Sequence, residues 1–392
     1  MSYVEIGSRP STLATKGSIT VRNIADTIAR LARTGAPAAR DTAPSRLTPL
    51  SEFGTNPGAL LGYMYVPADL PPGAPLVVVL HGCTQTAAGY DHGAGWSKLA
   101  DRAGFALVFP EQTRANNPNR CFNWFASEDT AQAGGEAESI AQMTETMIAR
   151  HGLDSSRVYV TGLSAGGAMT MAMLATRPDL FAGGAVIGGL AYGTATGVSQ
   201  ALDRMRGHGD TSDSALVEMV RSGARGHDGR WPTLAIWHGG ADATVSVANA
   251  DTIARQWRGV HGVDAKAVRT ERVGTAVHRI WSDVQGRDVV EDWTVPGMGH
   301  GTPIDPLRGE RLGTAGPFML DVGISSTAVI AKSWGLVPAA KAETAAKPAP
   351  VERVAKIAIP ISPKPASKPR AEAPAGIQVT IENALRAAGL MR

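Results

Sequence analysis

The sequence contains no apolar stretch as long as the roughly 18 residues that a membrane-spanning helix needs. In the chain of 392 residues, the longest candidate covers residues 76–80, which is enough only for a β-strand. No export signal is found, because residues 1–7 are followed by Ser8, Arg9 and Pro10 rather than by a continuous apolar segment and a small-residue cleavage site. We therefore expect a soluble protein, and the missing signal favours the cytoplasm.

Cysteine is scarce. Cys83 and Cys121 are the only two, which excludes a disulfide scaffold and a C-x-x-C metal cluster. One disulfide between them stays open, but it suits only an oxidising compartment, and the missing export signal argues against it. Four histidines also lack the spacing of zinc ligands, namely His81, His92, His238 and His300. We expect neither a metal site nor a cofactor.

An excess of charge of either sign is also lacking. The chain has 38 Lys and Arg against 35 Asp and Glu, a net charge of +3. A protein whose main function is to bind nucleic acid would be more basic, so that partner is disfavoured. A hydrophobic fraction of 43% together with 45 glycines is typical of folded globular chains and excludes a wholly disordered one.

Composition divides the chain into four parts. Residues 1–50 form an Ala-, Arg-, Thr- and Pro-rich extension with one helical pattern at 18–33. Residues 51–337 alternate short apolar runs with amphipathic stretches, which predicts an α/β catalytic domain with a largely parallel sheet. Residues 338–375 are rich in Pro, Ala and Lys and predict a disordered linker. Residues 376–392 regain apolar spacing and predict a short helix.

Within the α/β region the apolar runs predict seven strands and the amphipathic stretches four helices. The strands are expected at residues 76–80, 105–109, 157–161, 184–187, 233–237, 279–283 and 289–295. The helices are expected at residues 96–103, 136–151, 165–176 and 247–260.

The strongest local motif is Gly-Leu-Ser-Ala-Gly at residues 162–166, between a predicted strand and a predicted helix. In this G-x-S-x-G elbow the serine sits on a strained turn above the sheet, and the glycines allow close backbone passage. Without the flanking elements a plain turn would explain the pentapeptide equally well. With them, we identify Ser164 as the candidate nucleophile.

A serine hydroxyl needs a base that is oriented by an acid, and in this fold the acid and then the histidine follow the serine in the sequence. Asp242 lies on a Gly-rich loop after the apolar run 233–237, and His300 lies on a glycine loop after the last predicted strand. Taken singly, Asp242 could cap the helix that begins near Val247, and His300 could be a solvated loop residue. The order of all three favours a Ser164–Asp242–His300 triad.

An oxyanion hole takes one N–H from the residue after the nucleophile and one from the loop after an earlier strand. Ala165 supplies the first, and Cys83, or failing that Thr84, supplies the second. The alternative reading of His81 and the glycine after it is a strand-ending turn with a buried histidine. Cys83 itself could be a nucleophile, but no elbow surrounds it.

A substrate-side feature is the aromatic and amide cluster at residues 119–125, which is followed by a helix opening at Glu136. Aromatic groups on a loop beside a catalytic serine suggest a binding platform for an apolar or ring-bearing acyl chain, with Trp124 and Asn123 as candidate substrate-binding residues. A small satellite core under the loop, with Glu136 merely favouring the helix N-terminus, explains the cluster equally well.

Five segments together resemble the polyhydroxybutyrate (PHB) depolymerase family of esterases, which is related to feruloyl and acetylxylan esterases. They are Leu-His-Gly-Cys-Thr-Gln at 80–85, Cys-Phe-Asn-Trp-Phe at 121–125, Gly-Gly-Glu at 134–136, the strand and elbow at 157–169 and Gly-Met-Gly-His at 297–300. The resemblance covers roughly residues 55–335. It implies an α/β-hydrolase fold with helices on both faces of a mostly parallel sheet. It also implies the site residues already named: Ser164, Asp242, His300, Cys83 and Ala165.

The expected function is that of a serine esterase acting on short-chain polyhydroxyalkanoate esters, polymer or oligomer, through an acyl-enzyme. Two alternatives stay open: a feruloyl or acetylxylan type of esterase acting on plant polysaccharide esters, and a catalytically idle fold that binds a polymer. Transfer of the acyl group to an acceptor other than water would use the same residues. Many members of the family are secreted, so the resemblance also allows an extracellular location.

Overall fold

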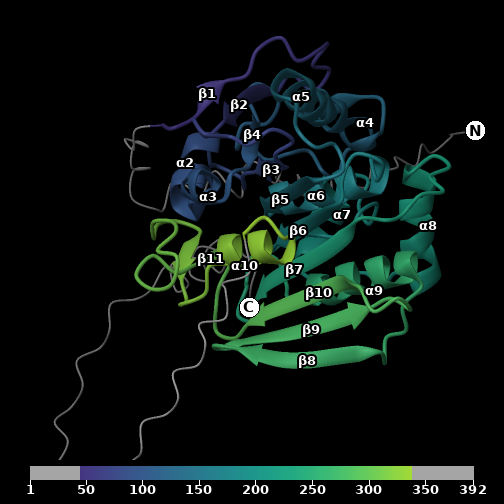
Figure 1. The fold of residues 1–392 in the computed structure, drawn as a ribbon. Helices are drawn as coiled ribbons and strands as arrows, with labels where there is room; N and C mark the ends of the chain where they lie inside the picture. The colour runs from purple at the N-terminus through teal and green to yellow at the C-terminus, as the bar shows by residue number, and fades with distance from the viewer. Residues whose placement is uncertain (1–44, 338–392) are drawn as a thin grey trace, which may run out of the picture.

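The structure is a computed structural model and describes residues 45–337. The helix expected at 18–33, the linker at 338–375 and the helix at 376–392 lie outside the described residues. Within them, a ten-stranded sheet crosses the molecule from β1 at one end to β8 at the other (Figure 1). The spatial order of its strands is β1-β2-β4-β3-β5-β6-β7-β10-β9-β8.

The six central strands run parallel to one another, and the two strands at each end are antiparallel. In the order of the chain the strands of this sheet are β1 Thr48–Pro49, β2 Leu61–Tyr65, β3 Leu76–Leu80, β4 Ala106–Glu111, β5 Val158–Leu163, β6 Gly183–Ile187, β7 Thr233–Gly239, β8 Val268–Val273, β9 Ala276–Ser282 and β10 Asp288–Val295. A second, two-stranded parallel sheet consists of β11 Thr302–Ile304 and β12 Met319–Asp321. The mostly parallel α/β fold expected from the sequence is confirmed.

Helices cover both faces of the sheet (Figure 1). Residues of α5, α6, α8 and α9 belong to the core on one face, and residues of α2, α3 and α10 to the core on the other. The helices are α2 Ala87–Ala94, α3 Trp96–Ala103, α4 Ser127–Thr130, α5 Gly135–His151, α6 Ala165–Thr176, α7 Val198–Met205, α8 Asp213–Gly223, α9 Ala248–His261 and α10 Ser326–Ser333.

The central strand β3 shows why its sequence is apolar throughout. All five of its residues are buried, with Leu76, Val78 and Leu80 in one core and Val77 and Val79 in the other. A strand packed on both faces must be apolar at every position, because alternate side chains point to opposite sides. Each fully buried Val or Leu contributes about 1.5–3 kcal/mol relative to an exposed one.

All the expected strands and helices of the α/β region are present, with ends that differ by a few residues. Several elements were not expected from the sequence. All six residues of β8 are exposed, so its sequence lacks the alternation of a half-buried strand. The short helix α2 contains two glycines, which lower helix propensity. In the part of the chain that the structure describes, no helix is long and apolar enough to cross a membrane.

Candidate active site

The loops that follow the parallel strands all emerge at the carboxyl edge of the sheet, where ligand sites form in open α/β folds. Ser164 directly follows β5, and α6 begins at the next residue. Asp242 lies three residues beyond the end of β7, and His300 five residues beyond the end of β10. The parallel register therefore brings positions far apart in the sequence to the same edge.

Ser164 has the strained backbone of a nucleophile elbow. Its φ of 58° and ψ of −117° lie in a region that residues with a Cβ rarely adopt, at a cost of about 1–3 kcal/mol. Two backbone bonds hold it there: its N–H donates to Ile187 O at 2.8 Å, and its carbonyl accepts from Ala168 N at 2.9 Å. The sheet and the helix thus offset the strain.

The two glycines of the elbow are required by close backbone contact. A Cβ on Gly162 would lie 2.4 Å from the carbonyl carbon and oxygen of Gly166. A Cβ on Gly166 would lie 2.5 Å from the carbonyl oxygens of Leu80 and His81, at the end of β3. The elbow is therefore pressed against the beginning of the loop that carries Cys83.

Asp242 and His300 are joined by a hydrogen bond of 2.7 Å between Oδ2 and Nδ1. Both side chains are buried, with exposures of 1% and 8%. The other carboxylate oxygen, Oδ1, accepts from the N–H groups of Thr244 and Val245, each at 2.9 Å. Asp242 does not cap α9, which begins after Val247 without a side-chain cap, and His300 is not a solvated loop residue.

Burial on its own would raise the pKa of Asp242. The hydrogen bond and the attraction from His300, followed by the N–H of Val245, outweigh burial and hold that pKa below its ordinary value. An ionised carboxylate can only accept hydrogen bonds, so Nδ1 of His300 carries the hydrogen. In the neutral imidazole, Nε2 is then the basic nitrogen.

Gly188 lies between this pair and the elbow. It follows Ile187, the residue that accepts the N–H of Ser164. A Cβ on Gly188 would lie 3.1 Å from Cε1 and 3.2 Å from Nδ1 of His300, and 3.6 Å from Oδ2 of Asp242. Within residues 45–337, no hydrogen bond joins the Ser164 hydroxyl to His300. Such bonds are often long before substrate is bound.

Cys83 and Ala165, the two expected oxyanion donors, line the same cavity as Ser164. Ala165 is the first residue of α6, so its N–H has no acceptor within the helix. On the loop after β3, Gly82 N donates to Gln85 Oε1 at 2.8 Å and Thr84 N donates to Asn119 O at 2.6 Å. Because the N–H of Thr84 is engaged by Asn119, the N–H of Cys83 rather than that of Thr84 is available at this turn of the described chain to hold an oxyanion.

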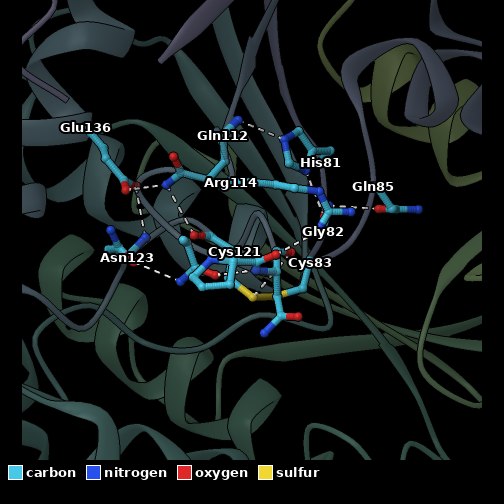
Figure 2. Close-up of a disulfide and its surroundings, with 12 residues drawn as sticks. His81, Gly82, Cys83, Gln85, Gln112, Arg114, Cys121, Asn123 and Glu136 are labelled. Carbon is cyan, nitrogen blue, oxygen red and sulfur yellow. Dashed lines mark hydrogen bonds between the residues drawn. A yellow bond between two sulfur atoms is a disulfide. The ribbon is translucent and has the colours of Figure 1, made fainter. Parts of the chain in front are cut away.

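The structure joins Cys83 and Cys121 by a disulfide, with 4.3 Å between their Cα atoms and a sequence separation of 38 (Figure 2). The argument against a bridge from the missing export signal is therefore overturned. The bridge ties the loop after β3 to the aromatic segment that begins at residue 119. Reasoning from the sequence left this pairing open, because nothing local brings the two positions together.

Gln112, which the sequence did not single out, connects these loops through buried hydrogen bonds (Figure 2). Its backbone N–H donates to Nε2 of His81 at 3.1 Å. Its side-chain Nε2 donates to the carbonyl of Cys121 at 3.2 Å and to Oε1 of Glu136. Burial lowers the pKa of His81 to about 4, so this histidine is neutral and structural, as the alternative reading proposed.

Glu136 holds the aromatic segment at residues 119–125 through a hydrogen bond to its backbone. Its Oε2 accepts from the backbone N–H of Asn123 at 2.9 Å, and its side chain is almost fully buried. Burial, and then the nearby carboxylate of Asp129, raises the pKa of Glu136 to about 8. Asn123 accepts a hydrogen bond from Asn117 at 3.1 Å and does not line the cavity beside the serine. The structure thus gives Asn123 a role in the loop, unlike the expected substrate contact.

A cavity of about 200 Å³ opens beside Ser164 and Ala165. Its lining includes the disulfide, the aromatic rings of Trp124 and Phe125, and apolar side chains from other elements. The remaining lining residues are Asn116, Asn117, Pro118, Leu190, Val198, Met205 and Val245. The rings of Trp124 and Phe125 lie edge to face, with 5.7 Å between their centroids. Among the described residues, no group of His, Cys, Asp or Glu could hold a metal ion.

Comparison with known proteins adds independent information. The family described as "Esterase PHB depolymerase" matches residues 62–280 of this chain. Poly(3-hydroxyalkanoate) depolymerase C of Paucimonas lemoignei is 45% identical over 292 residues, which cover 74% of this chain and 70% of that protein. A probable acetylxylan esterase A of Aspergillus clavatus is 32% identical over 270 residues, or 67% of this chain and 86% of that one.

A feruloyl esterase B of Talaromyces stipitatus is 31% identical over 266 residues, which cover 66% of this chain and 73% of that protein. Among solved structures, an acetyl xylan esterase from Aspergillus awamori superposes with a TM-score of 0.64 at 27% identity. That superposition covers 74% of this chain and 99% of the other. The similarity therefore extends through the fold that carries the candidate site.

Proposed function

Since the chain belongs to the PHB depolymerase family of esterases and has the α/β-hydrolase fold, we propose that it hydrolyses carboxylic esters through a Ser164–Asp242–His300 triad. One observation carries the proposal. The 2.7 Å hydrogen bond between Asp242 and Nδ1 of His300 lies at the same strand ends as the strained Ser164 elbow. A strained serine beside a buried acid–base pair is the arrangement that acyl transfer needs.

In this mechanism Nε2 of His300 takes the hydroxyl proton of Ser164 while Oγ attacks the ester carbonyl. Asp242 holds the imidazole in the required tautomer and stabilises its charged form. The tetrahedral intermediate then breaks its bond to the alkoxy oxygen, which takes the proton from His300 and leaves as an alcohol. Water repeats the sequence on the acyl-enzyme and releases the acid and the free serine.

The negative oxygen of each tetrahedral intermediate is held by the N–H groups of Cys83 and Ala165. Removing one such donor in a serine hydrolase typically costs about 10²- to 10³-fold in kcat, or about 2.7–4 kcal/mol. The proposal gains support from the contact between Gly166 and the carbonyls of Leu80 and His81, because it fixes the elbow against the loop that carries Cys83.

We further propose a short acyl group, as in poly(3-hydroxyalkanoate) esters, as the substrate. The cavity of about 200 Å³ is smaller than the roughly 300–1,000 Å³ of pockets that take drug-sized ligands. Asn116 and Asn117 belong to the lining, which is otherwise mostly apolar. A relative of 45% identity bears the name of a poly(3-hydroxyalkanoate) depolymerase, which favours that substrate class.

An acetyl ester of a polysaccharide is the second candidate, because its acyl group is smaller still and acetylxylan esterases are among the relatives. A feruloyl group would have to place an aromatic ring in the same small cavity. Hydrolysis rates on 3-hydroxybutyrate oligomers, acetylated xylan and methyl ferulate would rank the three. Equal rates on the oligomers and on methyl ferulate would contradict the argument from cavity size.

The remaining proposals concern the chain as a whole. We propose that residues 51–337 form the catalytic unit, together with the adjoining residues from 45 on, since Leu47 and Leu50 are buried in its cores. The Cys83–Cys121 bridge favours an oxidising compartment over the cytoplasm. Comparable activity of residues 45–337 and of the full chain would support the first proposal.

The direct test replaces the nucleophile. Ser164→Ala should abolish turnover of p-nitrophenyl butyrate and labelling by a fluorophosphonate probe, while the melting temperature stays close to that of the wild type. A Ser222→Ala variant, at an exposed serine on α8 that does not line the cavity, is the matched control and should retain both. Turnover by Ser164→Ala at the wild-type rate would reject the triad. A wild-type protein that neither turns over nor labels would indicate the idle polymer-binding fold instead.

A further inference from the structure

The mechanism leaves one buried ionisable side chain unused beside the acid. His238 lies on β7, four residues before Asp242, and is fully buried. Its Nε2 lies 2.8 Å from the carbonyl oxygen of Val245 and 3.5 Å from Oδ2 of Asp242. His238 therefore contacts the loop that presents the acid, rather than the cavity.

Val245 links this histidine to the acid. Its carbonyl meets Nε2 of His238, and its N–H donates to Oδ1 of Asp242 at 2.9 Å. Its side chain is fully buried and lines the cavity beside Ser164. One residue thus contacts the acid through its N–H, the histidine through its carbonyl and the substrate space through its side chain.

The tautomer of His238 follows from its neighbours. A carbonyl oxygen can only accept, so Nε2 carries the hydrogen that the Val245 carbonyl receives. Burial is the main reason that the pKa of His238 lies below its ordinary value, and the nearby His300 adds to it. The carbonyl of Val245 and the carboxylates of Asp242 and Asp292 act in the opposite direction without outweighing burial. The ring is therefore neutral.

The other ring nitrogen makes no contact of this kind. Within the described residues, Nδ1 of His238 is buried without a hydrogen-bond partner, and so is Oδ1 of Asp292 on the neighbouring strand. Buried polar atoms are normally hydrogen-bonded, so an unpartnered Nδ1 takes no part in holding the loop. Here the whole interaction of the ring with the loop passes through Nε2.

We propose that His238 is a positioning residue for ester hydrolysis: its Nε2–H fixes the carbonyl of Val245 and thereby the turn that aims Asp242 at His300. This inference rests on the proposed triad, in which Asp242 orients the base. Without the donor, Asp242 keeps its bonds to Gly239, Thr244, Val245 and His300, but the carbonyl of Val245 loses its tie to β7. The carboxylate then gains freedom relative to the imidazole.

Two substitutions separate the nitrogens. His238→Gln places an amide nitrogen near the position of Nε2, and His238→Asn places one near the position of Nδ1. We expect His238→Gln to keep kcat within about threefold of the wild type. Misplacement of a catalytic group by about 1 Å costs on the order of 10²-fold, so we expect His238→Asn to lower kcat by about 10- to 10²-fold with KM nearly unchanged.

The pH profile provides a readout that a merely structural role would not move. The acid limb of kcat/KM reports protonation of the base. If Asp242 is less well aimed, it stabilises the imidazolium less, so the midpoint of that limb should move to lower pH in His238→Asn and stay in place in His238→Gln. His238→Met, which has similar length and no donor, replaces the Asn variant should that one not fold, and should behave like it.

The inference would be overturned if His238→Gln and a folded donor-free variant, His238→Asn or His238→Met, had equal kcat. It would also be overturned if the donor-free variant lost kcat without a shift of the acid limb of its pH profile. Ser164→Ala distinguishes this failure from failure of the triad. If Ser164→Ala is inactive while the His238 variants do not differ, the triad stands and only the positioning role falls. If Ser164→Ala is active, the triad falls and the inference with it.

Discussion

Removal of the Cys83–Cys121 disulfide should affect stability and catalysis separately, and the structure allows both effects to be estimated. The perturbation is the double substitution Cys83→Ser with Cys121→Ser, or reduction of the wild type. The bridge connects the loop that carries the proposed oxyanion donor to the segment that carries Trp124 and Phe125. No other disulfide exists in this chain of two cysteines, so the effect belongs to this bond alone.

The stability effect follows from chain entropy. Closing a loop of 38 residues in the unfolded chain corresponds to about 4 kcal/mol of stabilisation at 25 °C. For a domain of about 290 residues, the unfolding entropy near the midpoint is about 0.6 kcal/mol/K, so this loss lowers the melting temperature by about 6 °C. Strain in the native state would make the measured loss smaller.

The catalytic effect should be smaller than complete loss of a donor. The residues on both sides of Cys83 keep their own bonds, from Gly82 N to Gln85 and from Thr84 N to Asn119. The backbone at residue 83 therefore stays restrained when the disulfide is absent. We therefore expect kcat to fall by about tenfold, a smaller loss than the roughly 10²-fold that removal of one donor costs.

The assay combines three measurements on the oxidised wild type, the reduced wild type and the double Ser variant. Thiol titration of the denatured protein without reductant should find no free thiol in the oxidised wild type. Urea unfolding gives the stability difference, and initial rates on p-nitrophenyl butyrate give the difference in kcat. Two free thiols in the oxidised protein, or a double variant as stable and as active as the wild type, would refute the reasoning.

Three further predictions concern other parts of the site. Gly188→Ala introduces a Cβ at a φ of 54° and 3.1 Å from Cε1 of His300, so kcat on p-nitrophenyl butyrate should fall by about 10²-fold. A kcat within twofold of the wild type would contradict this contact. Trp124→Ala removes an apolar wall of the cavity, so KM for butyrate esters should rise by about tenfold, or about 1.4 kcal/mol, with kcat less affected. An unchanged KM would show that the acyl group lies elsewhere. The pKa of Glu136 is raised from 4.5 to about 8 in the folded protein, so the free energy of unfolding should fall as pH rises from 4.5 through 8. Urea unfolding at a series of pH values should show a flatter fall for Glu136→Gln, and an equal slope in both proteins would refute the shift.

The sequence was most informative where the chemistry depends on local structure. The elbow could be predicted because a strand, a serine between glycines and a helix follow one another within 20 residues. The contacts of Gly162 and Gly166 explain why both positions exclude a Cβ. Asp242 and His300 could be named from their place after apolar strands, since the carboxyl ends of parallel strands meet at one edge.

Residues that act through distant partners left no local signal. Gln112 joins His81, Cys121 and Glu136, which lie 31, 9 and 24 residues away. A single glutamine after a strand has no pattern that announces such contacts. In the sequence His238 is one of several scattered histidines, although its partner Val245 lies only seven residues away. The turn that brings the two together depends on Asp242, and its shape cannot be read from spacing.

The contacts at the carboxyl edge divide the site into two mechanically distinct halves. Gly166 packs on the carbonyls of Leu80 and His81, so the proposed nucleophile and the loop of the proposed oxyanion donor form one rigid unit built on β5 and β3. The proposed acid and base follow β7 and β10. They contact Gly188, which follows Ile187, the residue of β6 that accepts the N–H of Ser164. Substitutions on the β3 and β5 side should therefore change nucleophile and oxyanion hole together and lower kcat without moving the acid limb of the pH profile. Substitutions on the β7 side, with His238 as the first case, should move that limb, because they alter how the carboxylate meets the imidazole.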